Sequence, residues 1–518
     1  MNRRDLLILL SLALLVRLLT ACLLTGPPYM DAYYYTAGAY RLAEGHGLLE
    51  PFLWNYLDDP AGIPNPGFLY WMPLPSILAA PFVVLLGRSF LAAQLPFVLL
   101  SALLPLVSYT IAWRIAESRR QAWAAGLLAI FSGFFIPFWV LPETFAPFAL
   151  FGSLALWLAA RQGKWVTTLA SGILVGLAHL TRADGILLLP VVALASLLSP
   201  RSHTKRRERS SDIGRWTFLL LGYLLVMSPW FLRNLNLIGV PLSSAGAKAL
   251  WLTDYDDIFC YNCDLSLRSY LAWGWPNILP SKLFALWTNF QRLLAEDFMV
   301  FLLPFSIIGL YHLRRRLSFT LSLIYLLIIY LVHSLAFTFP GWRGGLFHSS
   351  GALLPFLYAA AVEGLDVAVR WAAQRRRAWK LRQAQAVFTT GLVVMAILLS
   401  LYGLSIKLSA WKNSGQIYRT VGDWMTAHDV PRDTVVMAGN PPGFWYYTRR
   451  PTVVAPNDDL ETLLKCAARY QVEYLLLDWN YPRPLTALYT GEEQDARFSV
   501  AATWEKAEGQ VILYALDW

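Results

Sequence analysis

The sequence predicts a polytopic α-helical membrane protein with a small α/β domain at its C-terminal end. Hydrophobic residues make up 57% of the 518 positions and charged residues 15%, whereas soluble domains carry roughly 25% charged residues. The apolar runs do not alternate with the period of two that is typical of membrane barrel strands. They recur at the length of about 20 residues that crosses the hydrocarbon core as a helix, so we expect about eleven spans.

The net charge of +10 does not indicate a nucleic-acid partner, because the basic residues lie in short clusters between apolar runs. Such clusters are orientation signals that stay on the cytoplasmic side of a membrane. The clusters lie at residues 114–120, 201–215, 314–316 and 374–382. The arrangement that places all of them inside predicts a cell-membrane protein with a cytoplasmic N-terminus and an extracytoplasmic C-terminal domain.

The first apolar run, residues 6–25, follows "MNRR" and lacks a small-residue cleavage site, which predicts a retained anchor. The first outer loop, residues 26–90, then opens with "MDAYYYTAGAYRLAEGHGL". This stretch predicts an amphipathic helix that begins around Asp31 and ends at Gly45. Residues 50–70 are rich in Pro, Gly and aromatic side chains, and they predict an irregular ordered loop.

The apolar segment at residues 72–87 is short and interrupted by proline, so we expect a re-entrant or interfacial segment. A span ending near residue 140 follows the span at 91–113. The remaining spans are predicted at residues 145–160, 165–181, 185–199, 216–231, 297–312, 317–337, 349–369 and 386–404. Residues 233–296 form a long outer loop.

The composition changes near residue 405, which divides the chain into a transmembrane domain, residues 1–404, and an extracytoplasmic α/β domain, residues 405–518. About 110 residues suffice for a small independent domain. Helical periodicity covers residues 416–430 and 460–470, and strand patterns cover 432–439, 472–479 and 510–518.

Cys260 and Cys263 form "CYNC" in the long outer loop. A lone pair without nearby His or Cys partners is a weak metal signal, so we favour a structural disulfide or free thiols over a metal site.

Charged residues on the predicted outer face suggest a reaction centre. Asp31 opens the first outer loop, Glu143 lies in the next, and Arg343 and His348 lie in the loop "FPGWRGGLFHSS". A carboxylate can accept the proton of an incoming hydroxyl or amine, and Arg or His can stabilise a departing phosphate. We therefore expect the two carboxylates to meet the cationic patch in one cavity just above the lipid.

Each of these residues also has a structural interpretation. Asp31 could cap the helix that follows it, and Glu143 could interact with a helix dipole. Arg343 could anchor a span end among lipid phosphates, and His348 could bond to a nearby carbonyl as a structural histidine.

Other polar and aromatic residues near span ends have structural interpretations too. Tyr34 and Tyr35 suit interfacial packing. For Arg182 and Asp184, in "TRADG", we favour a short-range ion pair at a helix junction.

The stretch "MDAYYYTAGAYRLAEGHGL" resembles the first outer-loop motif of the GT-C glycosyltransferases, in the branch of protein O-mannosyltransferases and lipid A aminoarabinose transferases. Later landmarks of that branch resemble "LPETFAPFAL", "GLAHLTRADGILLLP", "SPWFLRNLNLIGVPL" and "WRGGLFHSSGALLPFL", in the same order. The resemblance covers most of residues 1–370. It implies an enzyme that takes a sugar from a polyprenyl-phosphate donor entering from the outer leaflet.

The resemblance also implies roles for single residues. Asp31 matches the acidic residue that acts as base or orients the acceptor, and Glu143 matches the acidic residue of the next outer loop that assists it. Arg343, with Arg233 and His348 as weaker candidates, is expected to hold the lipid phosphate.

We expect Tyr34 and Tyr35, together with the aromatic outer loops, to contact the substrates. The acceptor could be a lipid, a glycan or a protein. A divalent cation is compatible with the acidic residues, but the sequence does not require one and assigns no metal ligand.

The sequence therefore predicts a membrane glycosyltransferase. A transporter or flippase of a lipid-linked substrate is the alternative from another class. Transporters usually place ionisable residues at mid-membrane and show internal repeats, whereas here the charges lie at span ends and no repeat is evident. A catalytically inactive assembly protein is a third interpretation.

Overall fold

The computed structural model describes residues 1–161, 165–198, 209–376 and 378–517. Most of the basic cluster at residues 201–215 therefore lies outside the described residues. The chain divides into two compact units, which we describe separately. The first unit comprises Met1–Thr25, Trp71–Pro241 and Pro280–Ala410, and the second comprises Gly26–Tyr70, Leu242–Leu279 and Trp411–Trp518. Whether residues 405–518 fold independently stays a prediction.

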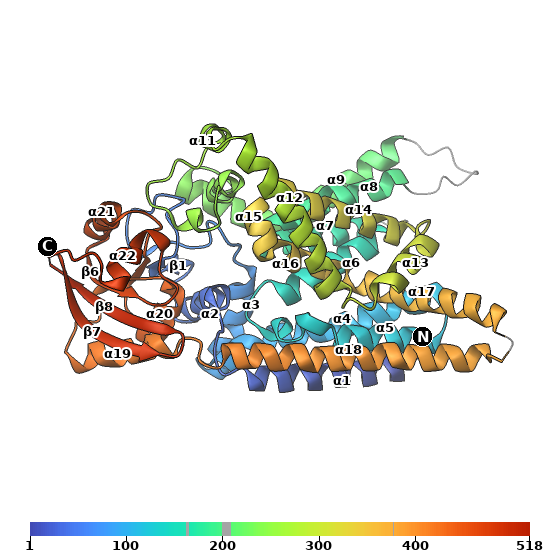
Figure 1. Cartoon of the computed structure of the whole chain (residues 1–518). Helices are drawn as coiled ribbons and strands as arrows, with labels where there is room; N and C mark the ends of the chain where they lie inside the picture. The colour runs from blue at the N-terminus through green and yellow to red at the C-terminus, as the bar shows by residue number, and fades with distance from the viewer. Residues whose placement is uncertain (162–164, 199–208, 377, 518) are drawn as a thin grey trace. The chain divides into compact units, whose positions relative to one another are not determined.

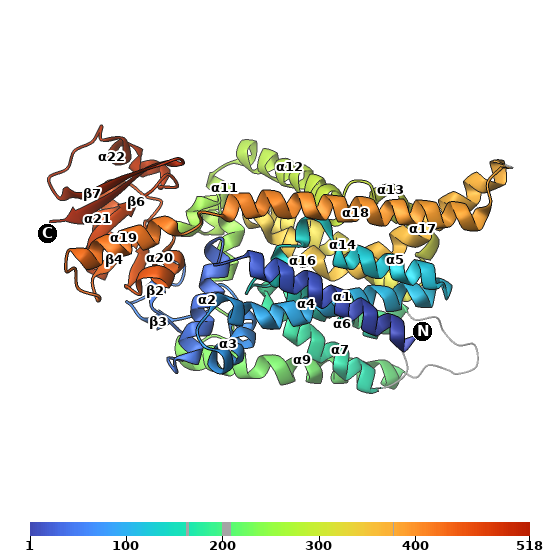
Figure 2. The same cartoon turned by 90° about the horizontal axis from the view of Figure 1, so that it is seen from below.

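The first unit is a helical bundle (Figures 1 and 2). Its main helices are α1 (Arg3–Leu23), α3 (Leu74–Leu86), α4 (Phe90–Ala116), α5 (Arg119–Ile130), α6 (Phe145–Ala159), α7 (Trp165–Thr181), α8 (Leu188–Leu198), α9 (Arg209–Ile238), α13 (Leu303–Leu313), α14 (Leu317–Leu331), α17 (Leu354–Arg375) and α18 (Leu381–Trp411). Helix α4 packs against α1, α5 and α17, and α7 packs against α6 and α9.

Among the described residues, six helices are long and apolar enough to cross a membrane, and a bent pair can form a seventh span. These helices establish a multi-pass membrane protein. Five shorter apolar helices, α3, α6, α7, α13 and the stretch Ala183–Leu198, coincide with other predicted apolar segments. The count of about eleven spans and the orientation of the bundle stay predictions.

The bent pair consists of Arg119–Ile130 and Gly133–Val140, with an angle of 50° between its halves. The break frees backbone carbonyls at the end of α5, which have no partner within the helix. Arg17 of α1, which is fully buried, supplies donors to two of them. Its Nη1 and Nη2 lie 3.0 Å from the carbonyl oxygens of Ile130 and Ala129. The charge of Arg17 within this apolar helix therefore stabilises the fold, a role that the apolar sequence around it does not indicate.

We expect Arg17→Ala to lower the free energy of unfolding by on the order of 3 kcal/mol, because it removes two charge-assisted hydrogen bonds and leaves a cavity. The thermal midpoint of the purified full-length protein in detergent measures this loss. Arg3→Ala is the matched control, since Arg3 lies on the same helix and is exposed. Equal midpoints for the two variants would contradict the role of Arg17.

Helices α13 and α17 approach closely in the first unit. A Cβ atom at Gly309 would lie 1.8 Å from the carbonyl oxygen of Ala360. Only glycine therefore permits the two backbones to touch at this point. Small residues commonly allow such contacts between membrane helices.

The second unit contains a six-stranded sheet in the order β2-β5-β4-β6-β8-β7. The strands are β2 (Phe52–Leu53), β4 (Val435–Ala438), β5 (Thr452–Val454), β6 (Val472–Leu477), β7 (Phe498–Lys506) and β8 (Gly509–Leu516). The strands β2, β5, β4 and β6 are parallel, whereas β8 and β7 pair antiparallel. Strand β2 comes from the first outer loop, which therefore contributes directly to this sheet.

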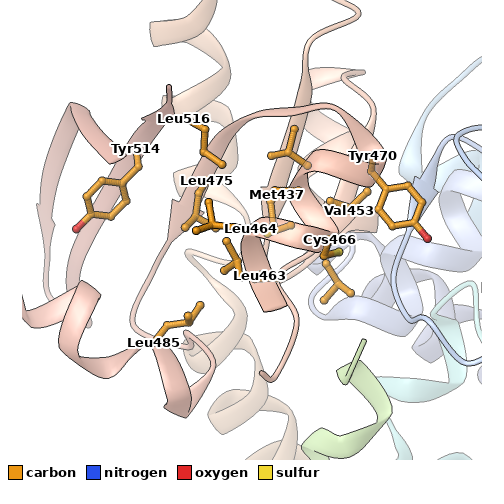
Figure 3. Close-up of a cluster of buried hydrophobic side chains, with 14 of the residues drawn as sticks. Met437, Val453, Leu463, Leu464, Cys466, Tyr470, Leu475, Leu485, Tyr514 and Leu516 are labelled. Carbon is orange, nitrogen blue, oxygen red and sulfur yellow. The ribbon is translucent and has the colours of Figure 1, made fainter. Parts of the chain in front are cut away.

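Alternating side chains of the sheet form two apolar clusters, as period-two geometry requires. On β4, Met437 belongs to one cluster, and Val436 and Ala438 belong to the other. Helix α21 (Leu460–Tyr470) covers the first cluster, shown in Figure 3. Helices α19 (Gln416–Ala427) and α20 (Pro441–Thr448) cover the second. The predicted helices and strands of this region are confirmed, whereas β5, β7 and α20 were not predicted.

The predicted long outer loop at residues 233–296 contains several helices. Helix α9 continues to Ile238, and α10 (Ala245–Lys248), α11 (Leu267–Ala272) and α12 (Trp275–Arg292) follow. Cys260 and Cys263 form a disulfide, which confirms the structural interpretation. Asp458 Oδ1 lies 3.1 Å from Cys260 Sγ, but the disulfide occupies the thiolates that a metal would need.

Candidate functional site

Asp31 is the second residue of α2 (Met30–Ala43) in the second unit, and Tyr29 is the N-cap residue. The backbone of Tyr29 is extended, with φ −158° and ψ 173°. The interpretation of Asp31 as the helix cap is therefore wrong. Its carboxylate lies in the first turn, where a negative charge suits the positive end of the helix dipole. Asp31 is partly exposed.

Buried tyrosines hold α2 in place. Tyr34 donates its hydroxyl proton to Glu50, and the Phe68 amide donates to Tyr34 Oη (3.0 Å) and Glu50 Oε1 (2.8 Å). Burial, together with the Glu50 carboxylate, raises the pKa of Tyr34 well above its ordinary value, so the hydroxyl stays protonated. Tyr35 packs edge-on against Tyr34. Both tyrosines are buried and serve packing, and their substrate contact stays a prediction.

Glu143 and His348 meet inside the first unit. Glu143 is 0% exposed and directly precedes Thr144, the N-cap residue of α6. His348 lies on α16 (Leu346–Ser350), and its Nδ1 is 3.5 Å from Glu143 Oε1 and 2.8 Å from Thr144 Oγ1. The imidazole stacks on Phe145, with ring centroids 3.9 Å apart. A buried carboxylate beside an imidazole can hold a proton and present it to a reacting group.

A second polar cluster surrounds Asp184. The predicted ion pair with Arg182 is confirmed, with 3.0 Å between Arg182 Nε and Asp184 Oδ1. His333 Nε2 lies 2.9 Å from Asp184 Oδ2, and the Ser349 hydroxyl donates to the same oxygen. Because Ser349 directly follows His348, α16 joins this cluster to the pair formed by Glu143. The sequence carries no local signal for His333 and Ser349, which lie 149 and 165 residues from Asp184.

Two π-helical turns of the first unit, η7 (Val332–Ala336) and η8 (Gly341–Gly345), pack against each other. A Cβ atom at Gly341 would lie 1.8 Å from the carbonyl oxygen of His333, so the approach requires glycine. Such turns are rare and occur frequently at functional sites. The structure thus places the exposed Arg343 of η8 on a turn that contacts the turn of His333.

Arg233 lies near the end of α9. Its guanidinium lies over the Trp230 ring, 4.6 Å from the centroid, and its Nη1 donates to Asn234 Oδ1 at 3.0 Å. These contacts are typical of an arginine at the end of a membrane helix. The predicted phosphate contacts of Arg233 and Arg343 stay predictions.

Known protein families and solved structures show which proteins this chain is similar to. Residues 67–232, which include Glu143, Arg182 and Asp184, match the family model described as dolichyl-phosphate-mannose-protein mannosyltransferase. The fold is similar to that of ArnT from Cupriavidus metallidurans bound to undecaprenyl phosphate. The TM-score is 0.58 at 13% identity, over 99% of this chain and 98% of that chain. The chain has the fold of the GT-C glycosyltransferases, and residues 67–232 match a family of that class. The resemblance found in the sequence and the predicted enzyme class are thereby confirmed.

Two further solved structures share the fold of this glycosyltransferase. The archaeal oligosaccharyltransferase AglB from Archaeoglobus fulgidus has a TM-score of 0.50 at 13% identity, over 99% of this chain and 74% of that chain. The arabinofuranosyltransferase AftD from Mycobacteria has a TM-score of 0.50 at 14% identity, over 99% of this chain and 42% of that chain. No curated protein sequence matches this glycosyltransferase significantly.

Proposed function

We propose that this glycosyltransferase transfers a sugar from a polyprenyl-phosphate donor to an acceptor on the extracytoplasmic face of the membrane. The observation that carries the proposal is the match of residues 67–232 to a family described by a dolichyl-phosphate-linked sugar donor. The fold is shared with ArnT bound to undecaprenyl phosphate and with AglB in complex with dolichol-phosphate and an inhibitory peptide. These ligands support a prenyl phosphate as the leaving group.

In the proposed step, the acceptor oxygen or nitrogen attacks the anomeric carbon of the sugar. The bond between that carbon and the phosphate oxygen breaks, and the polyprenyl phosphate leaves with the electron pair. Asp31 takes the proton of the acceptor or orients the acceptor for attack. Its carboxylate lies in the first turn of α2, where the positive end of the helix dipole favours a negative charge.

The first unit supplies the other groups. Glu143 orients the acceptor. The hydrogen bond between Thr144 and His348 Nδ1, with Glu143 Oε1 3.5 Å from the same nitrogen, holds the imidazole ready to bind a phosphate oxygen. Arg343 neutralises the charge that develops on the phosphate, and Arg233 is a weaker candidate for the same task. The proposal includes the predicted topology of about eleven spans with a cytoplasmic N-terminus.

Turnover of donor by the purified full-length protein tests the function. The protein in detergent is incubated with radiolabelled polyprenyl-phosphate sugars and a membrane extract as acceptor source. We expect label to pass from the lipid to the acceptor and free polyprenyl phosphate to accumulate. A transporter or flippase would leave the donor intact in detergent, because no membrane separates two compartments. Intact donor with every sugar supplied would overturn the proposal.

A further inference from the structure

A polar pocket in the first unit is lined by residues from the end of α4, the start of α5 and the helices α13 and α17, which can be followed in Figures 1 and 2. Its volume is about 360 Å³. None of the residues around Glu143 or Asp184 lines it. The pocket is therefore separate from the candidate active site, and the transfer reaction assigns it no role.

The floor of this pocket consists of two buried carboxylates one turn apart on α17. The side chains of Glu363 and Asp366 are 8% and 4% exposed. Gln121 Nε2 donates to Glu363 Oε2 (2.9 Å) and to Asp366 Oδ2 (2.7 Å), and Arg120 also donates to Asp366 Oδ2. Asp366 Oδ1 is buried and accepts no hydrogen bond from the described residues. Because an unsatisfied buried carboxylate oxygen is costly, this atom points to a ligand that donates a hydrogen bond.

The rim of the pocket is cationic and open to solvent. The side chains of His312 and Arg370 are 56% and 42% exposed, and both approach Glu363 Oε1, at 3.7 Å and 3.3 Å. Arg316 lines the pocket and donates to the carbonyl oxygens of Arg114 and Ile115 in the last turn of α4, each at 3.1 Å. These carbonyls are neutral and do not compensate the charge of Arg316. The pocket is lined by three arginines, Arg120, Arg316 and Arg370, and by only two carboxylates, so its net charge is positive. The rim therefore favours an anionic group.

Two rim residues have exposed aromatic neighbours in the sequence. Tyr311 precedes His312 and is 67% exposed, and Trp371 follows Arg370 and is 58% exposed. Exposed Tyr and Trp at the ends of membrane helices lie at the level of the lipid headgroups. Arg120 and Arg316, which line the pocket, belong to the basic clusters at residues 114–120 and 314–316. The mouth of the pocket thus suits a lipid better than a solute in the aqueous phase.

We propose that this pocket binds the headgroup of a phosphoethanolamine lipid from the surrounding bilayer. The ammonium donates to Asp366 Oδ1 on the floor, and the phosphate binds Arg370 and Arg316 at the rim. Asp366 and Arg370 lie four residues apart on α17, so their side chains emerge on the same face about one turn apart. The short ethylene link of ethanolamine holds its ammonium and phosphate at a comparable separation. Basic pockets between membrane helices bind phospholipid headgroups by the same chemistry.

Lipid binding to the purified, delipidated full-length protein tests this proposal, with bound lipids counted by native mass spectrometry. Phosphatidylcholine is the matched control, because it keeps the phosphate and the positive charge but has no N–H donor. Phosphatidylglycerol keeps the phosphate and lacks the cation. We expect phosphatidylethanolamine to bind about tenfold more tightly than either, as one hydrogen bond to a buried carboxylate allows.

A pair of variants locates the binding. Arg370→Gln should weaken phosphatidylethanolamine binding about tenfold, because it removes a charge-assisted bond to the phosphate. Arg375→Gln removes the same charge from the same helix outside the pocket, and it should leave binding unchanged. Both arginines are exposed enough for the variants to fold.

Three results would overturn the proposal. Equal binding of phosphatidylethanolamine and phosphatidylcholine would show that no N–H donor is recognised. Equal loss in both arginine variants would indicate attraction to general surface charge. Equal binding of soluble glycerophosphoethanolamine would indicate a solute site instead of a lipid site.

Discussion

Asp31→Asn is expected to leave the protein folded and inserted in the membrane while sugar transfer falls by about 100- to 10,000-fold, the usual contribution of a general base. Asparagine has nearly the same shape as aspartate and keeps a hydrogen-bond acceptor, but it cannot take a proton near neutral pH. The rate of label transfer from a polyprenyl-phosphate sugar by the purified variant measures the effect.

The structure gives a reason why this variant should fold. Helix α2 begins at its N-cap residue Tyr29, so the charge of Asp31 is not needed as a cap. The helix is fixed by the buried bonds among Tyr34, Glu50 and Phe68 and by the contact of Tyr33 with Tyr446, whose ring centroids are 5.5 Å apart. Loss of one partly exposed charge in the first turn should cost no more than about 1 kcal/mol.

Glu44→Gln is the matched control for Asp31→Asn. Glu44 is the exposed C-cap residue of the same helix, so the variant removes one carboxylate of α2 without touching the proposed base. We expect its transfer rate to stay within about twofold of the unmodified protein, as for a solvated surface charge. Full transfer activity in Asp31→Asn would return Asp31 to a structural role, and equal losses in both variants would show a general charge effect.

The helical bundle could be predicted because each span carries its own signal. An apolar run needs no partner to identify it as a membrane helix, and the span predicted at residues 91–113 is α4 (Phe90–Ala116) in the structure. The structural role of Arg17 could not be predicted in this way. Within an apolar run, an arginine suggests a functional site, and only the break after α5 shows which carbonyls it binds.

The sheet of the second unit could be predicted only in part. Strands β4, β6 and β8 have long apolar stretches, whereas β2 has two residues, Phe52 and Leu53, within a loop rich in Pro and Gly. Phe52 pairs with Thr452 on β5, about 400 positions further along the chain. Pairing over such a distance has no local pattern, because it depends on tertiary packing of the loop.

The candidate site could also be predicted only in part, because its contacts join residues far apart in the sequence. A motif could identify Glu143 and the "TRADG" pair as polar residues at span ends, and the pair is present. His348, which lies beside Glu143, was among the predicted site residues. The partners of Asp184, His333 and Ser349, could not be found, because a histidine or serine within an apolar segment gives no sign of which distant carboxylate it meets. The cap interpretation of Asp31 failed for a local reason, since the extended backbone of Tyr29 starts the helix two residues earlier.

Glu143→Gln is expected to lower the turnover number by about 100-fold, within the range for a carboxylate that handles or directs a proton. Glutamine fills the same fully buried space and keeps an oxygen near His348, so packing should be preserved. The substitution removes the negative charge that lies 3.5 Å from the imidazole nitrogen. We expect the effect in kcat, with the donor KM nearly unchanged, because Glu143 acts on the acceptor side of the reaction.

Thr144→Val distinguishes the effect of the Glu143 charge from the effect of the position of the His348 ring. The variant removes the 2.8 Å hydrogen bond between Thr144 and His348 but leaves the Glu143 carboxylate in place, so turnover should fall by no more than about tenfold.

The double variant Asp31→Asn/Glu143→Gln tests the sequence-based expectation that both carboxylates serve one acceptor. Residues that act as a unit give a double variant hardly slower than the slower single one. Multiplied losses would mean that the two carboxylates act independently, and unchanged turnover in Glu143→Gln would leave Glu143 as a structural residue at the start of α6.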